Sequence, residues 1–278
     1  MNSVNTNVGA MVALQSLNST NADLATVQSR INTGRKVNNA KDNGAIWAIA
    51  QSQRAESQAM NSVKESLSRG QSTVDVAMAA GESISDLLLQ MKEKALAAKD
   101  TALTTAARAS LNADFKSLRD QITTVVTNAE FNGANMIKAT AATTIKALAN
   151  TKAGAGGSVI TVSAQSLALG GANITVGATQ SFSTATTADA ALALVDASIA
   201  KVSDVLAKFG TGAKALGTHQ NFVSKLQDTL DAGVGSLVDA DLAKESARLQ
   251  ALQTKQQLGV QALSIANQSS SILLGLFR

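Results

Sequence analysis

The sequence contains no cysteine and only one histidine among its 278 residues. The absence of cysteine excludes disulfide bonds, thiolate metal sites and cysteine nucleophiles, whatever the redox compartment. A single imidazole excludes any site that requires two, including the usual zinc arrangements. The one histidine, His219, falls on a predicted helix and off its main apolar row. We interpret it as an ordinary surface or packing residue.

Proline is also absent, and aromatic residues make up only 3% of the chain. At the usual frequency of about 5%, a chain of this length would carry roughly 14 prolines. Because proline breaks helix interiors, its absence fits long uninterrupted helices. The hydrophobic fraction is nevertheless 45%, so the small and branched aliphatic residues must supply the buried surface. This composition is typical of thin helices packed side by side, in one or two domains.

The net charge of +4 at pH 7 is spread along the chain, without the basic stripe expected of a nucleic-acid-binding surface. We therefore expect no nucleic-acid partner. Both ends lack charged side chains, over residues 1–22 and 256–277. Asparagine, glutamine and serine interrupt both stretches, so neither resembles a secretory signal or a membrane-spanning helix. We expect no membrane insertion, and we expect the two ends to be buried together.

Three long helices are predicted between the two ends. Residues 46–99 carry apolar or small side chains at alternating steps of three and four, which predicts a helix about 80 Å long. A second helix is predicted over 104–129, before an Asn-Gly turn, and a third begins at a Thr186–Asp189 start signal. The first and third are expected to pair as an antiparallel coiled-coil rod. Its expected seam comprises Leu67, Val74, Ile84, Leu88, Ile199, Val202 and Leu206.

The segment 140–186 differs from the rest because it is rich in alanine, threonine, serine and glycine. Residues 159–162 are predicted to form a strand, and 167–169 with 174–176 a hairpin around two glycines. We favour a small solvent-facing β element, with a flexible linker as the alternative. A glycine-containing stretch farther on, 210–214, is expected to mark a break or thin point in the third helix.

The two terminal segments carry apolar residues on several sides. In 240–278 a third apolar row contains Leu258, Ile265 and Ile272, beyond the two rows expected of a simple helix pair. Apolar rows on several sides imply burial on several sides, which a polymer provides and a monomer does not. The residues expected to carry polymerisation are Leu17, Leu24, Val27, Ile31, Leu249, Leu252, Leu263, Ile272, Leu273 and Phe277.

Catalytic and cofactor-binding motifs are not found in the sequence. The glycine-rich runs 154–157 and 210–214 lack the spacing of a phosphate-binding loop. Paired carboxylates occur near predicted helix ends, where capping explains them. We expect no catalytic residues, no metal, no cofactor and no enzymatic activity.

Four stretches carry a recognisable pattern, in 30–45 (RINTGRKVNNAKDNGA), 131–133 (FNG), 236–245 (SLVDADLAKE) and 273–278 (LLGLFR). In sequence and in order they resemble the motifs of the bacterial flagellins, and most closely the short alphaproteobacterial, Caulobacter-type members. The resemblance covers about 1–138 and 190–278.

This resemblance implies a structural subunit that polymerises with its own copies into the flagellar filament, outside the cell, for swimming motility. The terminal helices 1–33 and 240–278 would form an inner coiled-coil tube, and 34–45 a connecting spoke. The outer tube would comprise 46–139 and 187–239, with 140–186 facing solvent. Members of the family leave the cell through the flagellar type III apparatus. The implied partners are therefore an export chaperone and the filament cap and junction proteins.

Two finer expectations follow from the resemblance. Enteric-type flagellins carry a receptor-binding motif, LQRVRELA, whose counterpart here is 88–95, LLQMKEKA. This stretch keeps the motif's glutamate as Glu93. It has Gln90 and Lys94 in place of an arginine and a leucine, beside Lys92, which predicts weak activation of the Toll-like receptor. O-linked nonulosonic acid glycans are expected on serine or threonine within 140–186.

Two other functions remain open from the sequence. A hook–filament junction protein shares the same terminal helices but occurs in few copies. A soluble coiled-coil adaptor or signalling protein would form a small oligomer that does not need the last 30 or so residues.

Overall fold

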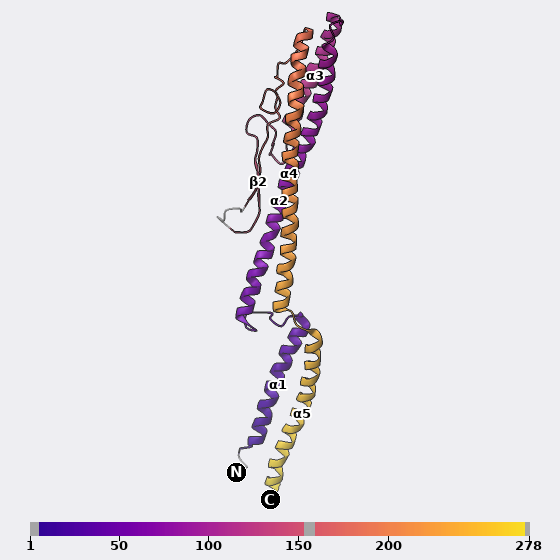
Figure 1. Cartoon of the computed structure of the whole chain (residues 1–278). Coiled ribbons are helices and arrows are strands. Elements are labelled where there is room, and N and C mark those ends of the chain that lie inside the picture. The colour runs from indigo at the N-terminus through magenta and orange to yellow at the C-terminus, as the bar shows by residue number, and fades with distance from the viewer. Residues whose placement is uncertain (1–5, 153–158, 276–278) are drawn as a thin grey trace. The chain divides into compact units, whose positions relative to one another are not determined.

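The computed structural model describes residues 6–152 and 159–275, with side chains described as far as residue 268. Over these residues the elements follow in the order α1 (Val8–Thr33), α2 (Gly44–Ala98), α3 (Thr105–Asn128), β1 (Ile145–Leu148), β2 (Val159–Val162), α4 (Ala185–Val238) and α5 (Leu242–Gly275) (Figure 1). The mainly helical fold predicted from the sequence is confirmed. The chain divides into two compact units, Met1–Ala55 with Thr229–Arg278, and Glu56–Asp228.

The first unit is built on α1 and α5, which lie side by side and run in opposite directions (Figure 1). Asn7 at the start of α1 donates from Nδ2 to the carbonyl oxygen of Ala266, 2.7 Å away. Near the other end of α1, Arg30 pairs with Glu245 at the start of α5. Gly259 of α5 has no side chain and so leaves room for Leu17 of α1. Opposite ends of the chain therefore meet along the whole described length of α1.

A small core closes the first unit beside this pair. It contains the buried side chains of Val37, Ala50, Val234 and Val238, with Trp47 packed against it. The backbone amides of residues 36 and 37 donate to the carbonyl oxygen of Val238, so the loop after α1 is tied to the end of α4. These contacts hold the end of α1 and the start of α5 in place within the first unit.

In the second unit, α2 and α4 form an antiparallel pair. Lys92 Nζ lies 2.8 Å from Asp196 Oδ1, and Gln227 Nε2 donates to Asn61 Oδ1 at 3.1 Å. Gly81 allows a close approach, because a Cβ there would lie 2.8 Å from a methyl of Leu206. Of the expected seam, Leu67, Val74, Ile84, Leu88 and Val202 are buried, and Ile199 and Leu206 are half-buried.

The third helix of this unit, α3, returns along α2. Arg108 is buried and donates from Nε to the carbonyl oxygen of Ala98 and from Nη2 to that of Asp100, which satisfies acceptors at the end of α2. After α3 the predicted turn is present: Asn132 and Gly133 have positive φ angles of 50° and 80°. The positive angles suit a tight turn of two central residues.

The small antiparallel β element is confirmed, and the strand predicted over 159–162 is β2, but the hairpin predicted over 167–176 is wrong. The ladder forms instead between β1 and β2, antiparallel, with Ile145 opposite Val162 and Leu148 opposite Val159. Residues 169 and 174 form only an isolated bridge. The amide of Leu167 donates to the carbonyl oxygen of Ile137, 2.8 Å away. The Leu167 amide, which a local hairpin would pair, thus bonds a more distant segment, while the amide of Gly170 donates to the carbonyl oxygen of Val176.

The segment 140–186 also does not face solvent throughout. Its side chains of Ile145, Val162, Leu167, Ile174 and Phe182 are buried. Helix α4 continues through residues 210–214, so the break expected there is absent; Gly212 is a thin point that admits the side chain of Val162. The start of α4 also lies earlier than expected, with the hydroxyl of Thr184 capping the amide of Thr187.

Candidate assembly interface

The helix pair α1 and α5 leaves apolar side chains uncovered. Met11 is 63% exposed and Ile265 is 68% exposed. Among the side chains that the structure describes, the large apolar residues exposed on the two helices are Val8, Met11, Val12, Leu14, Leu242, Leu258, Val260 and Ile265. Because most of this surface belongs to the charge-free ends of the chain, no charge keeps it solvated. Surface of this kind marks a site of association with other protein.

The polymerisation residues expected from the sequence occupy other positions on the same helices. Val27 and Leu252 are buried, and Leu17, Leu24, Ile31, Leu249 and Leu263 are half-buried. At Gly259 an added Cβ would lie 3.3 Å from Leu17 Cδ1, so this leucine packs across the pair. The side chains of Ile272 and Leu273, and the whole of Phe277, lie outside the described residues.

Sequence reasoning therefore selected residues that hold α1 to α5 and missed most of those that point away from the pair. The exposed residues missed include Val8, Met11, Val12 and Val260. For two other exposed residues of α5 the sequence did carry a signal, because the third apolar row of the last segment contained Leu258 and Ile265. On α5 the apolar residues show almost no preference for one side of the helix, as expected when several sides become buried.

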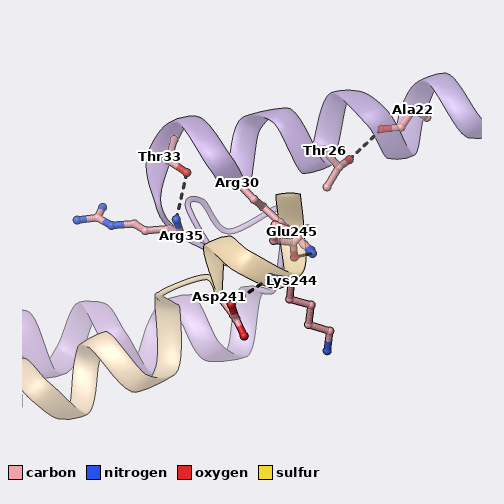
Figure 2. A network of polar contacts seen from close by, with 8 residues as sticks. All are labelled: Ala22, Thr26, Arg30, Thr33, Arg35, Asp241, Lys244 and Glu245. Atoms are coloured by element: carbon pink, nitrogen blue, oxygen red, sulfur yellow. Dashed lines mark hydrogen bonds and ion pairs between the residues drawn. The ribbon is translucent and has the colours of Figure 1, made fainter. Parts of the chain in front are cut away.

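Charged groups concentrate at the joint between α1 and α5, where Figure 2 shows Arg30 of α1 reaching the carboxylate of Glu245. Arg30 Nη1 lies 3.2 Å from Glu245 Oε1, and the glutamate side chain is only 11% exposed. The carboxylate of Asp241 accepts from the amide of Lys244 and so caps the start of α5. Of these contacts, the Arg30–Glu245 ion pair joins the two helices and aligns them at one end.

The loop after α1 is ordered by a second carboxylate. Asp42 accepts hydrogen bonds from the backbone amides of Asn38 and Asn39, at 2.8 and 3.1 Å. The bond from Asn38, followed by that from Asn39, lowers the pKa of Asp42. A cleft of about 480 Å³ beside this loop is lined by Asp42, Arg30 and Glu245 among others, with both signs of charge. The arrangement is that of a structural joint, with its charges used in capping and pairing.

The residues of the expected receptor motif lie on α2 in the second unit. Gln90 and Glu93 are exposed, and Lys92 and Lys94 are half-buried. Lys92 pairs with Asp196 of α4, and Lys94 pairs with Asp114 of α3 at 3.3 Å. Both lysine side chains are thus directed toward neighbouring helices of the same chain.

The structure offers no other chemical site where its residues are described. There, no cluster of three or more histidine, cysteine, aspartate or glutamate side chains is arranged to bind a metal. Among the same residues, none of the helices has the combination of length and apolar character needed to cross a membrane. The single histidine, His219, forms a hydrogen bond with the backbone: its Nε2 lies 2.6 Å from the carbonyl oxygen of Ala149.

Comparison with known proteins identifies the family. Residues 4–142 match the bacterial flagellin N-terminal helical region, and 192–277 match the bacterial flagellin C-terminal helical region. Flagellin FljM of Caulobacter vibrioides is 59% identical over 100% of this chain and 99% of its own length. A flagellin of Brucella melitensis is 35% identical over the full length of both chains.

A solved structure shares the fold at low identity. A Vibrio parahaemolyticus protein described as flagellar hook-associated has a TM-score of 0.57, with 16% identity over 71% of this chain and 100% of its own. At this identity the likeness shows the fold alone, and nothing in the matches favours the junction-protein alternative. Nor do they support an adaptor or an enzyme. The chain belongs to the bacterial flagellins, the structural subunits that build the extracellular flagellar filament.

Proposed function

We propose that copies of this chain polymerise through the α1–α5 pair, with residues 1–33 and 240–278 forming an inner coiled-coil tube. Residues 34–45 then act as the spoke, 46–139 and 187–239 as the outer tube, and 140–186 as the outward segment. The observation that carries this proposal is the set of exposed apolar side chains on α1 and α5, most of which belong to the charge-free ends of the chain.

Burial of this surface favours assembly. Eight large apolar side chains of the pair are about half exposed or more. Completing the burial of each contributes about 1 kcal/mol, since fully burying such a side chain contributes about 1.5–3 kcal/mol. The gain is repeated in every subunit, and it opposes the loss of freedom on association.

A pair of substitutions at one position tests the proposal. Ile265→Asp places a charge on the exposed apolar surface, where it must be desolvated on assembly, whereas Ile265→Leu keeps the apolar surface. We expect seeded polymerisation, followed by light scattering and electron microscopy, to fail for Ile265→Asp and to persist for Ile265→Leu. Circular dichroism should show equal helix content in both monomers. Normal filaments from Ile265→Asp would refute a role for this surface.

An export chaperone and the cap and junction proteins are proposed as further partners. The exposed apolar side chains of α1 and α5 support the chaperone proposal, because a subunit that carries them can aggregate before it reaches the filament unless another protein binds them. A chaperone that binds here should protect the amides of α5 from hydrogen exchange in a soluble complex. Unchanged exchange over Leu242–Gly275 would argue against it.

Glycan attachment is proposed for 140–186. Support comes from hydroxyl side chains that remain exposed although the segment packs on the helices, among them Thr140, Thr161, Ser163 and Thr179. The intact mass of subunits from native filaments should exceed the mass of the bare sequence. A mass equal to that of the unmodified chain would exclude glycans.

Weak activation of the Toll-like receptor is proposed from the α2 motif. The support is the pairing of Lys92 and Lys94 with Asp196 and Asp114, which occupies both cations within the chain. In a reporter-cell assay we expect a potency well below that of an enteric-type flagellin. Equal potency would contradict the proposal.

A further inference from the structure

Methionine sulfur is the most easily oxidised group in this chain. The sequence has no cysteine and no tyrosine, one tryptophan and six methionines. Peroxides convert a methionine thioether to a sulfoxide, and no thiol is present that would react first. Which methionines react depends on their exposure to the solvent that carries the oxidant.

The described methionines differ widely in exposure. Met60, Met91 and Met136 are buried, with exposed fractions of 4%, 0% and 1%, and Met78 is half-buried. Met11 of α1 is 63% exposed. Of these described side chains, that of Met11 is therefore the one that a dissolved oxidant reaches most readily.

Met11 lies on the side of α1 opposite to α5. An added Cβ at Gly9 would lie 3.8 Å from Cβ of Ala266, so Gly9 faces α5. Two residues along an α-helix correspond to a rotation of about 200°, which places Met11 on the far side. Val8 and Val12, each within about one turn of Met11, are also exposed, at 64% and 60%. Met11 thus belongs to the apolar surface of α1 that α5 leaves uncovered.

Met11 is also the chemically distinct member of that surface. Among the described side chains, the other large apolar residues exposed on α1 and α5 are valine, leucine and isoleucine. Peroxides do not oxidise these aliphatic side chains under conditions that oxidise a thioether. Residues 1–22 carry no charged side chain, so the surface around Met11 is apolar. One oxygen atom added at Met11 therefore changes an otherwise unreactive apolar surface.

Oxidation of Met11 by hydrogen peroxide transfers one oxygen atom to its sulfur. A lone pair of Sδ attacks one peroxide oxygen, the S–O bond forms, and the O–O bond breaks. The proton of the transferred oxygen passes to the other oxygen, which leaves as water. The sulfur loses two electrons and the peroxide gains them. The product is a sulfoxide, which is polar where the thioether was apolar.

The added oxygen has different consequences in the free subunit and in the filament. In the free subunit Met11 is exposed to water, so the sulfoxide is hydrated and the packing of α1 on α5 is unchanged. In the assembly proposed above, apolar groups of other copies cover the same side chain. A polar oxygen buried there without a hydrogen-bond donor is unfavourable. Oxidation of Met11 therefore disfavours assembly more than it disfavours folding of the subunit.

We propose that Met11 is a reversible oxidation site that controls polymerisation. Peroxide oxidises it in the free subunit, and the oxidised subunit adds poorly to a filament. Because the coupling is reciprocal, assembly in turn protects Met11 from the oxidant. Methionine sulfoxide reductases reverse the change: a dithiol supplies two electrons, becomes a disulfide, and the sulfoxide oxygen leaves as water. This regulation rests on the polymerisation proposed for the α1–α5 pair.

Limited oxidation of the free subunit tests the site itself. The monomer is treated with hydrogen peroxide for increasing times, and mass spectrometry of its peptides, with fragmentation, assigns each added oxygen to a residue. Met11 should be oxidised well before the three buried methionines, Met60, Met91 and Met136. Oxidation of any of these three at the rate of Met11 would overturn the assignment.

Seeded polymerisation of the oxidised subunit tests the consequence. Its critical concentration should rise at least about fivefold, the lower end of the effect expected when a polar group is buried without a partner. Met11→Leu keeps an apolar side chain of similar volume and should polymerise normally before and after the same treatment. The control Met78→Leu removes the half-buried thioether and should remain as sensitive as the parent. Both variants retain Met1, which lies outside the described residues. Loss of polymerisation by oxidised Met11→Leu would therefore overturn the proposal.

Reversal and protection complete the test. Incubation of oxidised subunits with both methionine sulfoxide reductases and dithiothreitol should return the critical concentration to within about twofold of the untreated parent. Met11 in preformed filaments should be oxidised at least about fivefold more slowly than in free subunits. Equal rates in the two states, or normal polymerisation of fully oxidised subunits, would refute the Met11 site and leave the polymerisation proposal intact. Failure of the untreated parent to form filaments would refute the polymerisation proposal itself.

Discussion

Gly212 provides a sharp test of how the β element packs on α4. An added Cβ at this position would lie 2.7 Å from Cγ1 of Val162 and 2.9 Å from its Cγ2, closer than real Cβ contacts. Val162 is only 6% exposed, and its β-branched side chain has little freedom to move away. Gly212→Ala should therefore force β2 away from the helix.

Two opposing effects decide the size of the change. Overpacking of a buried contact costs about 1–3 kcal/mol. Replacing glycine by alanine inside a helix stabilises by about 1 kcal/mol. Gly212→Ala should accordingly lower the free energy of unfolding by about 0–2 kcal/mol. In a Val162→Ala background the overlap is gone, so the same substitution should raise the free energy of unfolding by about 1 kcal/mol.

Helix α4 supplies matched controls. An added Cβ at Gly210 or Gly217 meets no atom within 4 Å. Gly210→Ala and Gly217→Ala should each stabilise by up to about 1 kcal/mol. The assay is urea unfolding of the monomer, followed by far-ultraviolet circular dichroism, for single and double variants. Equal stabilisation by Gly212→Ala and Gly210→Ala, or the same effect of Gly212→Ala in both backgrounds, would refute the reasoning.

Three other substitutions test further contacts. Phe182→Ala removes one ring of an edge-on pair with Phe115, whose centroids lie 5.2 Å apart, and should cost about 3–5 kcal/mol in urea unfolding. Arg108→Met keeps the aliphatic stem but leaves carbonyl groups at the end of α2 without their donors. It should cost about 1–3 kcal/mol in thermal unfolding, and an unchanged midpoint would contradict this role. Because its folded pKa is lowered, Asp42 stabilises the folded loop above the unfolded value of about 3.9 and loses this effect as pH falls through the folded pKa. The protection factors of the two loop amides against hydrogen exchange should therefore fall below about pH 4, and Asp42→Asn should remove most of that pH dependence.

The helices were predictable because helix formation depends mainly on near neighbours. The apolar steps of three and four placed α2 within two residues of its observed bounds, at Gly44–Ala98. The Asn-Gly turn after α3 was equally local, since it needs only two residues that accept positive φ. The start of α4 was missed by a residue or two because several threonines could serve as the cap.

The candidate interface was only partly predictable. Sequence analysis predicted that the charge-free ends are buried together, but the residues that it selected include Val27 and Leu252, which the α1–α5 pair covers by itself. When a helix has apolar residues on all sides, its sequence does not show which side packs against the other helix of the pair. Only the packing of α1 on α5 shows that Met11 and Ile265 remain exposed.

By itself the sequence determined the class of the protein: long helices without proline, ends without charge, and the motifs of its family. The tertiary structure alone decided the partners of each surface. It paired Ile145 with Val162 rather than building a hairpin over 167–176, and it turned Lys92 toward α4. The physical reason is how far apart the interacting residues lie in the sequence. Helical periodicity depends on residues three and four apart, whereas strand pairing, ion pairing and exposure depend on distant segments that meet only after the chain has folded.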